Sequence, residues 1–128
     1  MPASYDYAVI RVVPRVERGE RINAGVIVSC ATQRFLEAAV ALDAARLRAL
    51  DPTVDVAEIE AALAVIPWIA AGDERGGPVA KLPRGERFHW LVAPRSAVIQ
   101  TSPVHSGIDD DPRAALHALL ARYVLPTS

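Results

Sequence analysis

Two stretches of this sequence hold the groups best suited to binding an anion, and they lie far apart along the chain. Guanidinium groups bind carboxylates and phosphates through paired hydrogen bonds, and amide, hydroxyl and imidazole groups add directional ones. If both stretches lie in one sheet, these side chains meet at one end of it and form a site for a small anionic ligand. The candidate residues are Arg11, Arg18, Asn23, Arg95, Ser96 and His105.

The second stretch also allows a purely structural interpretation. Arg95-Ser96 is typical of a turn, and Thr101-Ser102-Pro103 is typical of a strand exit whose hydroxyl groups cap the backbone. On this interpretation the polar side chains serve the fold and bind nothing.

Arg11 is unusual because it lies in the middle of an apolar strand. A guanidinium taken out of water needs a partner, and Glu20 or Glu37 across the sheet would supply one. The alternative is an anion-binding arginine at the mouth of a pocket lined by Tyr5 and Tyr7.

Catalytic and metal-binding patterns are weak. A nucleophilic site needs Ser96 or Ser102 beside His105 and a carboxylate, but the sequence has no GxSxG turn. The histidines show no helical ligand spacing, and there is no cysteine pair. We therefore expect a non-enzymatic accessory module without cofactor or metal, which binds a protein partner or a small anionic ligand. The alternative is an enzyme that acts on a phosphorylated or nucleic-acid substrate with His105 as acid/base.

Composition limits the class of protein further. A chain of 128 residues suits a single domain, residues 1–128, with a core of its own. A net charge of −1 makes a nucleic-acid partner unexpected. The single cysteine, Cys30, excludes an internal disulfide, and from the residue pattern we expect neither a signal peptide nor a membrane span. We expect a cytoplasmic protein, and the high alanine, arginine and proline content suggests a bacterial source.

The elements that must position these residues begin with a hairpin. Residues 5–13 and 22–30 are rich in valine, isoleucine and tyrosine, which favours two strands joined by a charged loop. Gly25 predicts a bulge or a close backbone approach. Residues 34–42 are expected to form a third strand, with a helix as the competing assignment.

Helical signals follow the first strands and return at the end of the chain. Asp43 predicts the start of a short helix to Leu50, and Asp55 the start of a longer one that ends or kinks at Ile66, before Pro67. Asp111-Pro112 is typical of the start of a last helix.

A second hairpin is expected between these helices, from strands at 88–93 and 97–101. Residues 73–87 are predicted to be irregular, and 102–107 to leave the sheet. The predicted fold is α+β, an antiparallel sheet of about five strands with two to three helices packed on one face. Exposed strand edges favour a homodimer formed by edge pairing.

With these segments in view, the chain resembles the bacterial domain-of-unknown-function family 3037. The resemblance lies in YDYAVIRVVPRVERGERINAGVIV, RFLEAAVALD and HWLVAPRSAVIQTSPVHSG, and it covers nearly the whole chain. The family is uncharacterised and supplies no catalytic residues. Its genes are sometimes found beside genes of HipA-like kinases, which implies a partner protein of that kind.

Overall fold

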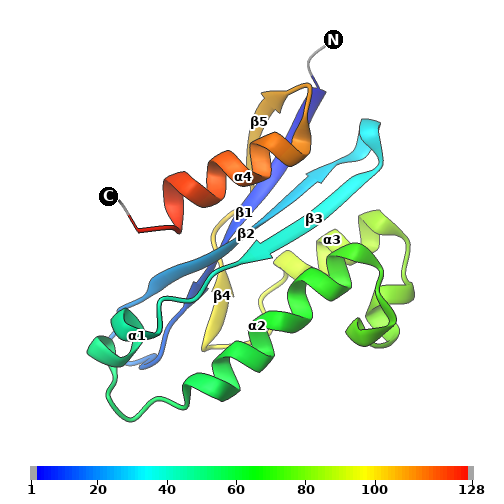
Figure 1. The fold of residues 1–128 in the computed structure, drawn as a ribbon. Helices are drawn as coiled ribbons and strands as arrows, with labels where there is room; N and C mark the ends of the chain where they lie inside the picture. Colours follow the sequence, from blue (N-terminus) through cyan, green and yellow to red (C-terminus); the bar gives the residue numbers. More distant parts are fainter. Residues whose placement is uncertain (1–2, 127–128) are drawn as a thin grey trace.

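Five strands and four α-helices build this α+β protein, in a computed structural model that describes residues 3–126 (Figure 1). The strands are β1 (Ala3–Val12), β2 (Ile22–Cys30), β3 (Phe35–Val40), β4 (Ile99–Thr101) and β5 (His105–Asp109). The helices are α1 (Ala44–Leu50), α2 (Val56–Ala71), α3 (Arg84–Val92) and α4 (Pro112–Tyr123). The predicted fold class is confirmed, with four helices where two to three were expected.

The sheet is antiparallel and is organised around β1 and β2, as predicted. The order is β3-β2-β1-β4, and β5 pairs with the other half of the β1 edge that β4 occupies. The register shifts after Ile10, because Ile10 faces Gly25 and Arg11 faces Asn23, which leaves Ala24 as the extra residue of a bulge. A Cβ at Gly25 would lie 2.6 Å from the carbonyl oxygen of Ala39, so the close backbone approach predicted there is confirmed.

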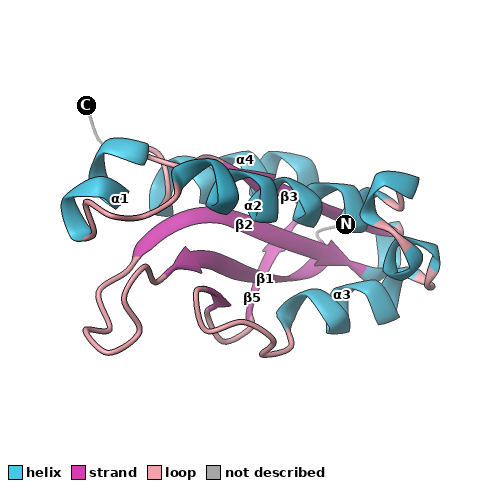
Figure 2. Cartoon of the chain, turned by 90° about the horizontal axis from the view of Figure 1, so that it is seen from below, coloured by secondary structure: helices cyan, strands magenta, loops and turns pink. Residues whose placement is uncertain are grey.

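Helices cover both faces of the sheet, so the expectation that they pack on one face was wrong. Strand side chains alternate between the faces, and each face buries its own cluster. The helix α2 contacts β3 and α3, whereas α4 contacts β2, β3 and β1 (Figure 2).

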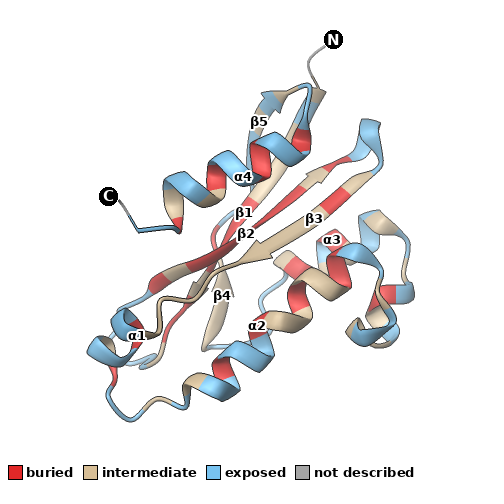
Figure 3. Cartoon of the chain, in the orientation of Figure 1, coloured by how far each residue is buried: buried red, intermediate tan, exposed pale blue. Residues whose placement is uncertain are grey.

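We call the two clusters the main core and the second core. The main core joins one sheet face to α1, α2 and α3, and includes Ile10, Ile27, Leu36, Leu47, Leu63, Ile69, Phe88 and Leu91. The second core joins the other face to α4, and its buried residues are Val26, Val28, Leu116, Leu119 and Val124. Figure 3 shows the buried positions concentrated along β1, β2 and the inner sides of the helices. Both clusters use side chains of the same strands.

The capping signals identify the helix starts correctly. The Asp55 carboxylate accepts a hydrogen bond from the Glu58 backbone N–H at 3.1 Å, and the Asp111 carboxylate accepts from Arg113 and Ala114. The helix α2 does not end at Ile66. It continues through Pro67 to Ala71 and ends at Gly72, whose φ of 72° suits glycine.

The segment between α2 and β4 differs most from the sequence prediction. Residues 73–83 are not irregular, because two short 3₁₀ helices, Glu74–Gly76 and Pro78–Lys81, pack against α2. The expected strand at 88–93 belongs to α3, in which Phe88 and Leu91, three residues apart, are buried together. The second hairpin therefore does not form.

The end of the predicted fifth strand, Ile99–Thr101, does pair with β1. Of residues 102–107, which were expected to leave the sheet, 105–107 stay in it, because residues 105–109 form β5 along the first half of β1. Within residues 3–126, no helix combines the length and the apolar character needed to cross a lipid bilayer.

Candidate functional site

A cavity of about 690 Å³ lies between α2, α3 and the segment that leads into β4. We call it the Arg95 cavity. Most of the surface that faces it is apolar. The helix α2 contributes Ala62, Val65, Ile66 and Ile69, α3 contributes Trp90, Leu91 and Val92, and residues 93–96 and 99–103 complete the lining.

Arg95 lies at the rim of this cavity, and its guanidinium is held over an aromatic ring. The helix α3 ends at Val92, so Trp90 faces the loop that carries Arg95. The guanidinium carbon lies 3.5 Å from the centre of the Trp90 ring, and Nη1 donates a hydrogen bond to the Ala93 carbonyl at 3.1 Å. Partial burial lowers the pKa of Arg95. Arg95 has no carboxylate partner among residues 3–126.

The hydroxyl groups near Arg95 stabilise the cavity wall. The Ser96 Oγ accepts hydrogen bonds from the backbone N–H groups of Val98 and Ile99, at 3.1 and 3.2 Å. Ser102 is buried, and its Oγ accepts from the Val9 N–H at 2.9 Å and donates to the Pro103 carbonyl. The structural interpretation of these serines as backbone caps is confirmed.

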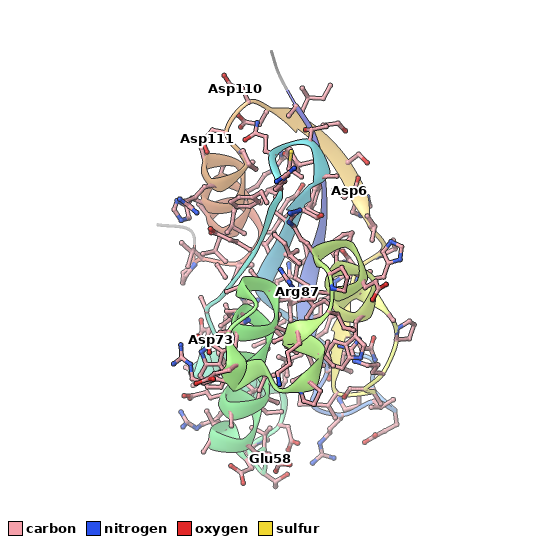
Figure 4. All side chains as sticks on the ribbon, turned by 90° about the vertical axis from the view of Figure 1, so that its right-hand side faces the viewer. Asp6, Glu58, Asp73, Arg87, Asp110 and Asp111 are labelled. Atoms are coloured by element: carbon pink, nitrogen blue, oxygen red, sulfur yellow. The ribbon has the colours of Figure 1, made fainter. Side chains whose placement is uncertain are left out.

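A second cavity of about 390 Å³ continues from the first, since Ala62, Ser96 and Ile99 line both. Its other polar groups are acidic. Glu58, labelled in Figure 4, comes from the first turn of α2. Asp51 accepts hydrogen bonds from the hydroxyl and the backbone N–H of Thr53, which together with Arg15 lower the pKa of its carboxyl.

Arg11 and Asn23 face each other across the β1–β2 pair, with Gln100 on the other side of Arg11. The Arg11 Nε is buried without a hydrogen-bond partner among residues 3–126. Burial first, and then the charge of Arg21, lower the pKa of Arg11. The Asn23 amide donates to the Tyr123 carbonyl at 2.9 Å, at the end of α4.

The expected ion pair of Arg11 is wrong. Glu20 bonds to Arg18, and Glu37 bonds to Arg113 on α4. Both carboxylates are therefore already engaged by other arginines.

The remaining two candidates lie in separate places. Arg18 is exposed in the β1–β2 loop, and its hydrogen bond with Glu20 raises the Arg18 pKa. His105 is exposed on β5 opposite Tyr7, with ring centres 5.5 Å apart. The structure thus brings together Arg95 with Ser96 and, separately, Arg11 with Asn23. Of the six candidates, only Arg95 and Ser96 line either cavity.

The side chains that could serve as nucleophiles or metal ligands are occupied or dispersed in the described part of the chain. The hydroxyls of Ser96 and Ser102 are engaged by backbone groups, as described above. Cys30 is buried, with its sulfur 3.5 Å from the Thr32 hydroxyl. In the described part of the chain, no group of three or more His, Cys, Asp or Glu side chains is arranged to hold a metal ion.

Sequence reasoning missed Trp90 as the support of Arg95, because it assigned Trp90 to a strand. Two signals favour the helix that presents it. Pro83 comes directly before the first residue of α3, and Glu86 lies in its first turn, both typical of a helix start. Trp90 and Arg95 are then separated by the end of α3 and a short loop, which folds the guanidinium back over the ring.

Comparison with known proteins gives one finding. A family model described as "Protein of unknown function (DUF3037)" matches residues 7–124, nearly the whole chain. Searches of curated proteins and of solved structures returned no match.

Proposed function

The chain belongs to the DUF3037 family, and we propose that it is a binding module for a small anionic ligand with an apolar body. The body fills the Arg95 cavity, and a carboxylate or phosphate group meets the Arg95 guanidinium. One observation carries the proposal: an apolar cavity with an arginine at its rim that no carboxylate neutralises among residues 3–126.

The size and lining of the cavity suit a small molecule. Ligand pockets have volumes of roughly 300–1,000 Å³ and are mostly apolar, with a few polar groups that fix orientation. The Arg95 cavity has about 690 Å³, and its floor is made of aliphatic side chains of α2 such as Val65 and Ile69. Burial of an alkyl or aromatic body there supplies affinity by removing apolar surface from water.

The charge at the rim selects an anion. Trp90 contacts the face of the Arg95 guanidinium, which leaves N–H groups at the edge of the guanidinium plane free to donate. Partial burial lowers the Arg95 pKa because it disfavours the charged form. An anionic partner compensates for this cost, so carboxylates and phosphates are preferred over neutral compounds of the same shape.

The alternative, an enzyme with His105 as acid/base, gains no support from this geometry. A general acid or base must lie within reach of its substrate, and His105 does not line the Arg95 cavity.

A charged probe and a neutral probe of the same chain length test the proposal. Octanoate and octanol share an alkyl body, and isothermal titration calorimetry measures their affinities. We expect octanoate to bind about tenfold or more tightly than octanol, a difference of about 1.4 kcal/mol. In Arg95→Ala the preference should vanish. In Arg46→Ala, which removes an exposed arginine of α1 that lines neither cavity, it should persist.

A second variant tests the cavity itself. Ala62 is exposed and lines both cavities, so Ala62→Phe fills the space without disturbing the main core. It should abolish binding of both probes and leave the melting temperature nearly unchanged. Equal affinities for octanoate and octanol in the wild type, or full binding by Ala62→Phe, would overturn the proposal.

A further inference from the structure

The strand β5 presents an unpaired edge with an exposed apolar residue. Its only strand partner among residues 3–126 is β1, and in Figure 4 it runs along the outer margin of the molecule, beyond the labelled Asp6. His105 and Ser106 are exposed, and the side chain of Ile108 is 74% exposed. Proteins usually protect such edges with charges, prolines or covering loops, because unpaired N–H and C=O groups pair readily with another strand.

We propose that this edge pairs antiparallel with the same edge of a second copy of the chain, around a two-fold axis at Gly107. The partner is a second copy because the strand is complementary to itself. His105 and Asp109 lie at equal distances on either side of Gly107. In an antiparallel pair centred on Gly107, His105 therefore faces Asp109 of the partner subunit, and the contact occurs twice.

This register satisfies the polar groups at both ends. An imidazole N–H donates to a carboxylate whether the ring is neutral or charged. Asp109 uses its Oδ1 to accept the Asp111 N–H at 2.9 Å, which leaves its other oxygen free for the histidine. Side chains that attract each other across two strands stabilise the pair, while a parallel arrangement or a shift by two residues loses this match.

The same register also covers the exposed isoleucine. Ile108 faces Ser106 of the partner subunit and lies diagonal to the partner's Ile108, within reach for long side chains. At the axis, the Tyr5 ring lies across Gly107, since a Cβ there would be 2.4 Å from the tyrosine side chain. The glycine is thus shielded on that face by the tyrosine of its own chain, as is common for edge glycines.

The pairing is expected to be weak. The strand β5 has only five residues, so the interface falls below the area of a stable dimer. The dimer should therefore appear only at high protein concentration. It lies at β5 and not at the Arg95 cavity, so this proposal and the ligand proposal fail independently.

Sedimentation velocity over a range from micromolar to millimolar protein tests the inference. The wild type should show a concentration-dependent dimer. Ile108→Lys should weaken dimerisation about tenfold or more, because it places two lysines near the axis. Since Ile108 is exposed, its replacement should leave the circular dichroism spectrum unchanged. Val16→Lys is the matched control, as Val16 is 50% exposed in the β1–β2 loop and should not affect dimerisation.

Cross-linking tests the register. The Ser106→Cys and Ile108→Cys proteins, mixed and oxidised, should form a disulfide-linked heterodimer faster than either protein alone forms a homodimer. The native Cys30 is buried and should not compete. A wild type that stays monomeric to millimolar concentration, an unaffected Ile108→Lys dimer, or equal cross-linking of mixed and single variants would overturn the proposal.

Discussion

The arginines of this protein differ in role because their immediate surroundings differ. Arg75 forms two hydrogen bonds to the Asp73 carboxylate, and Arg113 binds Glu37. Arg95 lies over an aromatic ring at the rim of a cavity, and the Arg11 Nε has no partner among residues 3–126. Neither Arg11 nor Arg95 has a carboxylate partner among residues 3–126, and of these two only Arg95 lines a cavity.

The isolated Arg11 leads to a stability prediction. A buried donor without a partner costs about 1–3 kcal/mol, and Arg21 adds repulsion. Replacement of Arg11 by methionine keeps the stem and removes the charge. We expect Arg11→Met to leave the free energy of unfolding unchanged or to raise it by about 1 kcal/mol, as measured by urea denaturation. The exposed Arg18→Met is the control and should change little. A loss of about 3 kcal/mol in Arg11→Met would instead indicate a partner for Arg11.

Asp73 should make stability depend on acid. Hydrogen bonds from the Arg75 side chain and backbone N–H lower the pKa of Asp73 from 3.8 to about 2. A carboxyl with a lower pKa in the folded state contributes stability above its unfolded pKa and loses it as the pH falls through the folded pKa. The contribution should therefore disappear between about pH 4 and pH 2. Carboxyl NMR titration should give a pKa near 2 in the wild type and a higher one in Arg75→Met. Equal values would show that the hydrogen bonds do not form in solution.

Of the six candidate site residues, the structure brings to the cavity only the two that are adjacent in sequence. Arg95 and Ser96 are adjacent in sequence and both line the cavity. Trp90 was missed, because its role depends on the helix that turns it toward Arg95. Arg11 was noticed as unusual, but its lack of a carboxylate partner could not be predicted. Glu20 is engaged by Arg18 in the same loop, and Glu37 by Arg113, which is distant in sequence.

At the scale of elements, the first hairpin and the capped helices were predictable, while α3 and β5 were not. Phe88, Trp90 and Val92 alternate as in a strand, yet packing of Phe88 and Leu91 against the main core selects the helix. The strand β5 contains one isoleucine, but also glycine and aspartate, which are depleted in strands. It forms because the free edge of β1 supplies backbone partners, which no local pattern reveals.

Alanine substitutions at two glycines test the close-packed bulge of β2, which was predicted from the sequence, and the helix α3, which was not. Gly25→Ala places a Cβ 2.6 Å from the Ala39 carbonyl oxygen and 2.9 Å from Ile10, in the bulge of β2. It should lower the free energy of unfolding by about 1–3 kcal/mol. Gly85→Ala meets no atom within 4 Å and lies inside α3, so it should raise the free energy of unfolding by about 0.5–1 kcal/mol. Both are measured by urea denaturation. A destabilising Gly85→Ala would argue against a helix at this position.

The whole molecule consists of two cores that share one sheet. The strand β2 gives Ile27 to the main core and Val28 to the second core, so neither cluster can separate without the strand between them. Arg87, labelled in Figure 4, connects α3 to α2 on the side of the sheet that carries the main core. It donates from α3 to the Leu82 carbonyl at 2.8 Å and to the Ala70 carbonyl of α2 at 3.4 Å.

The distribution of aromatic residues allows the two sides to be followed separately. Trp68 and Trp90, the two tryptophans, lie on α2 and α3, while Tyr5, Tyr7 and Tyr123 pack at the second core. Tryptophan fluorescence therefore reports on one side, and the near-ultraviolet tyrosine signal reports mainly on the other. Because the shared strands couple both sides, the two signals should show the same urea midpoint.

A pair of core variants makes this test sharper. Leu119→Ala in the second core and Leu63→Ala in the main core each remove a buried leucine side chain, and each should cost about 2–5 kcal/mol. If the sheet couples the two sides, either variant shifts the fluorescence midpoint and the tyrosine midpoint equally, although each mutation touches only one cluster. In Leu119→Ala, the tyrosine midpoint could instead fall while the tryptophan midpoint stays unchanged. That result would show that α4 and the second core unfold independently of the face that carries the Arg95 cavity.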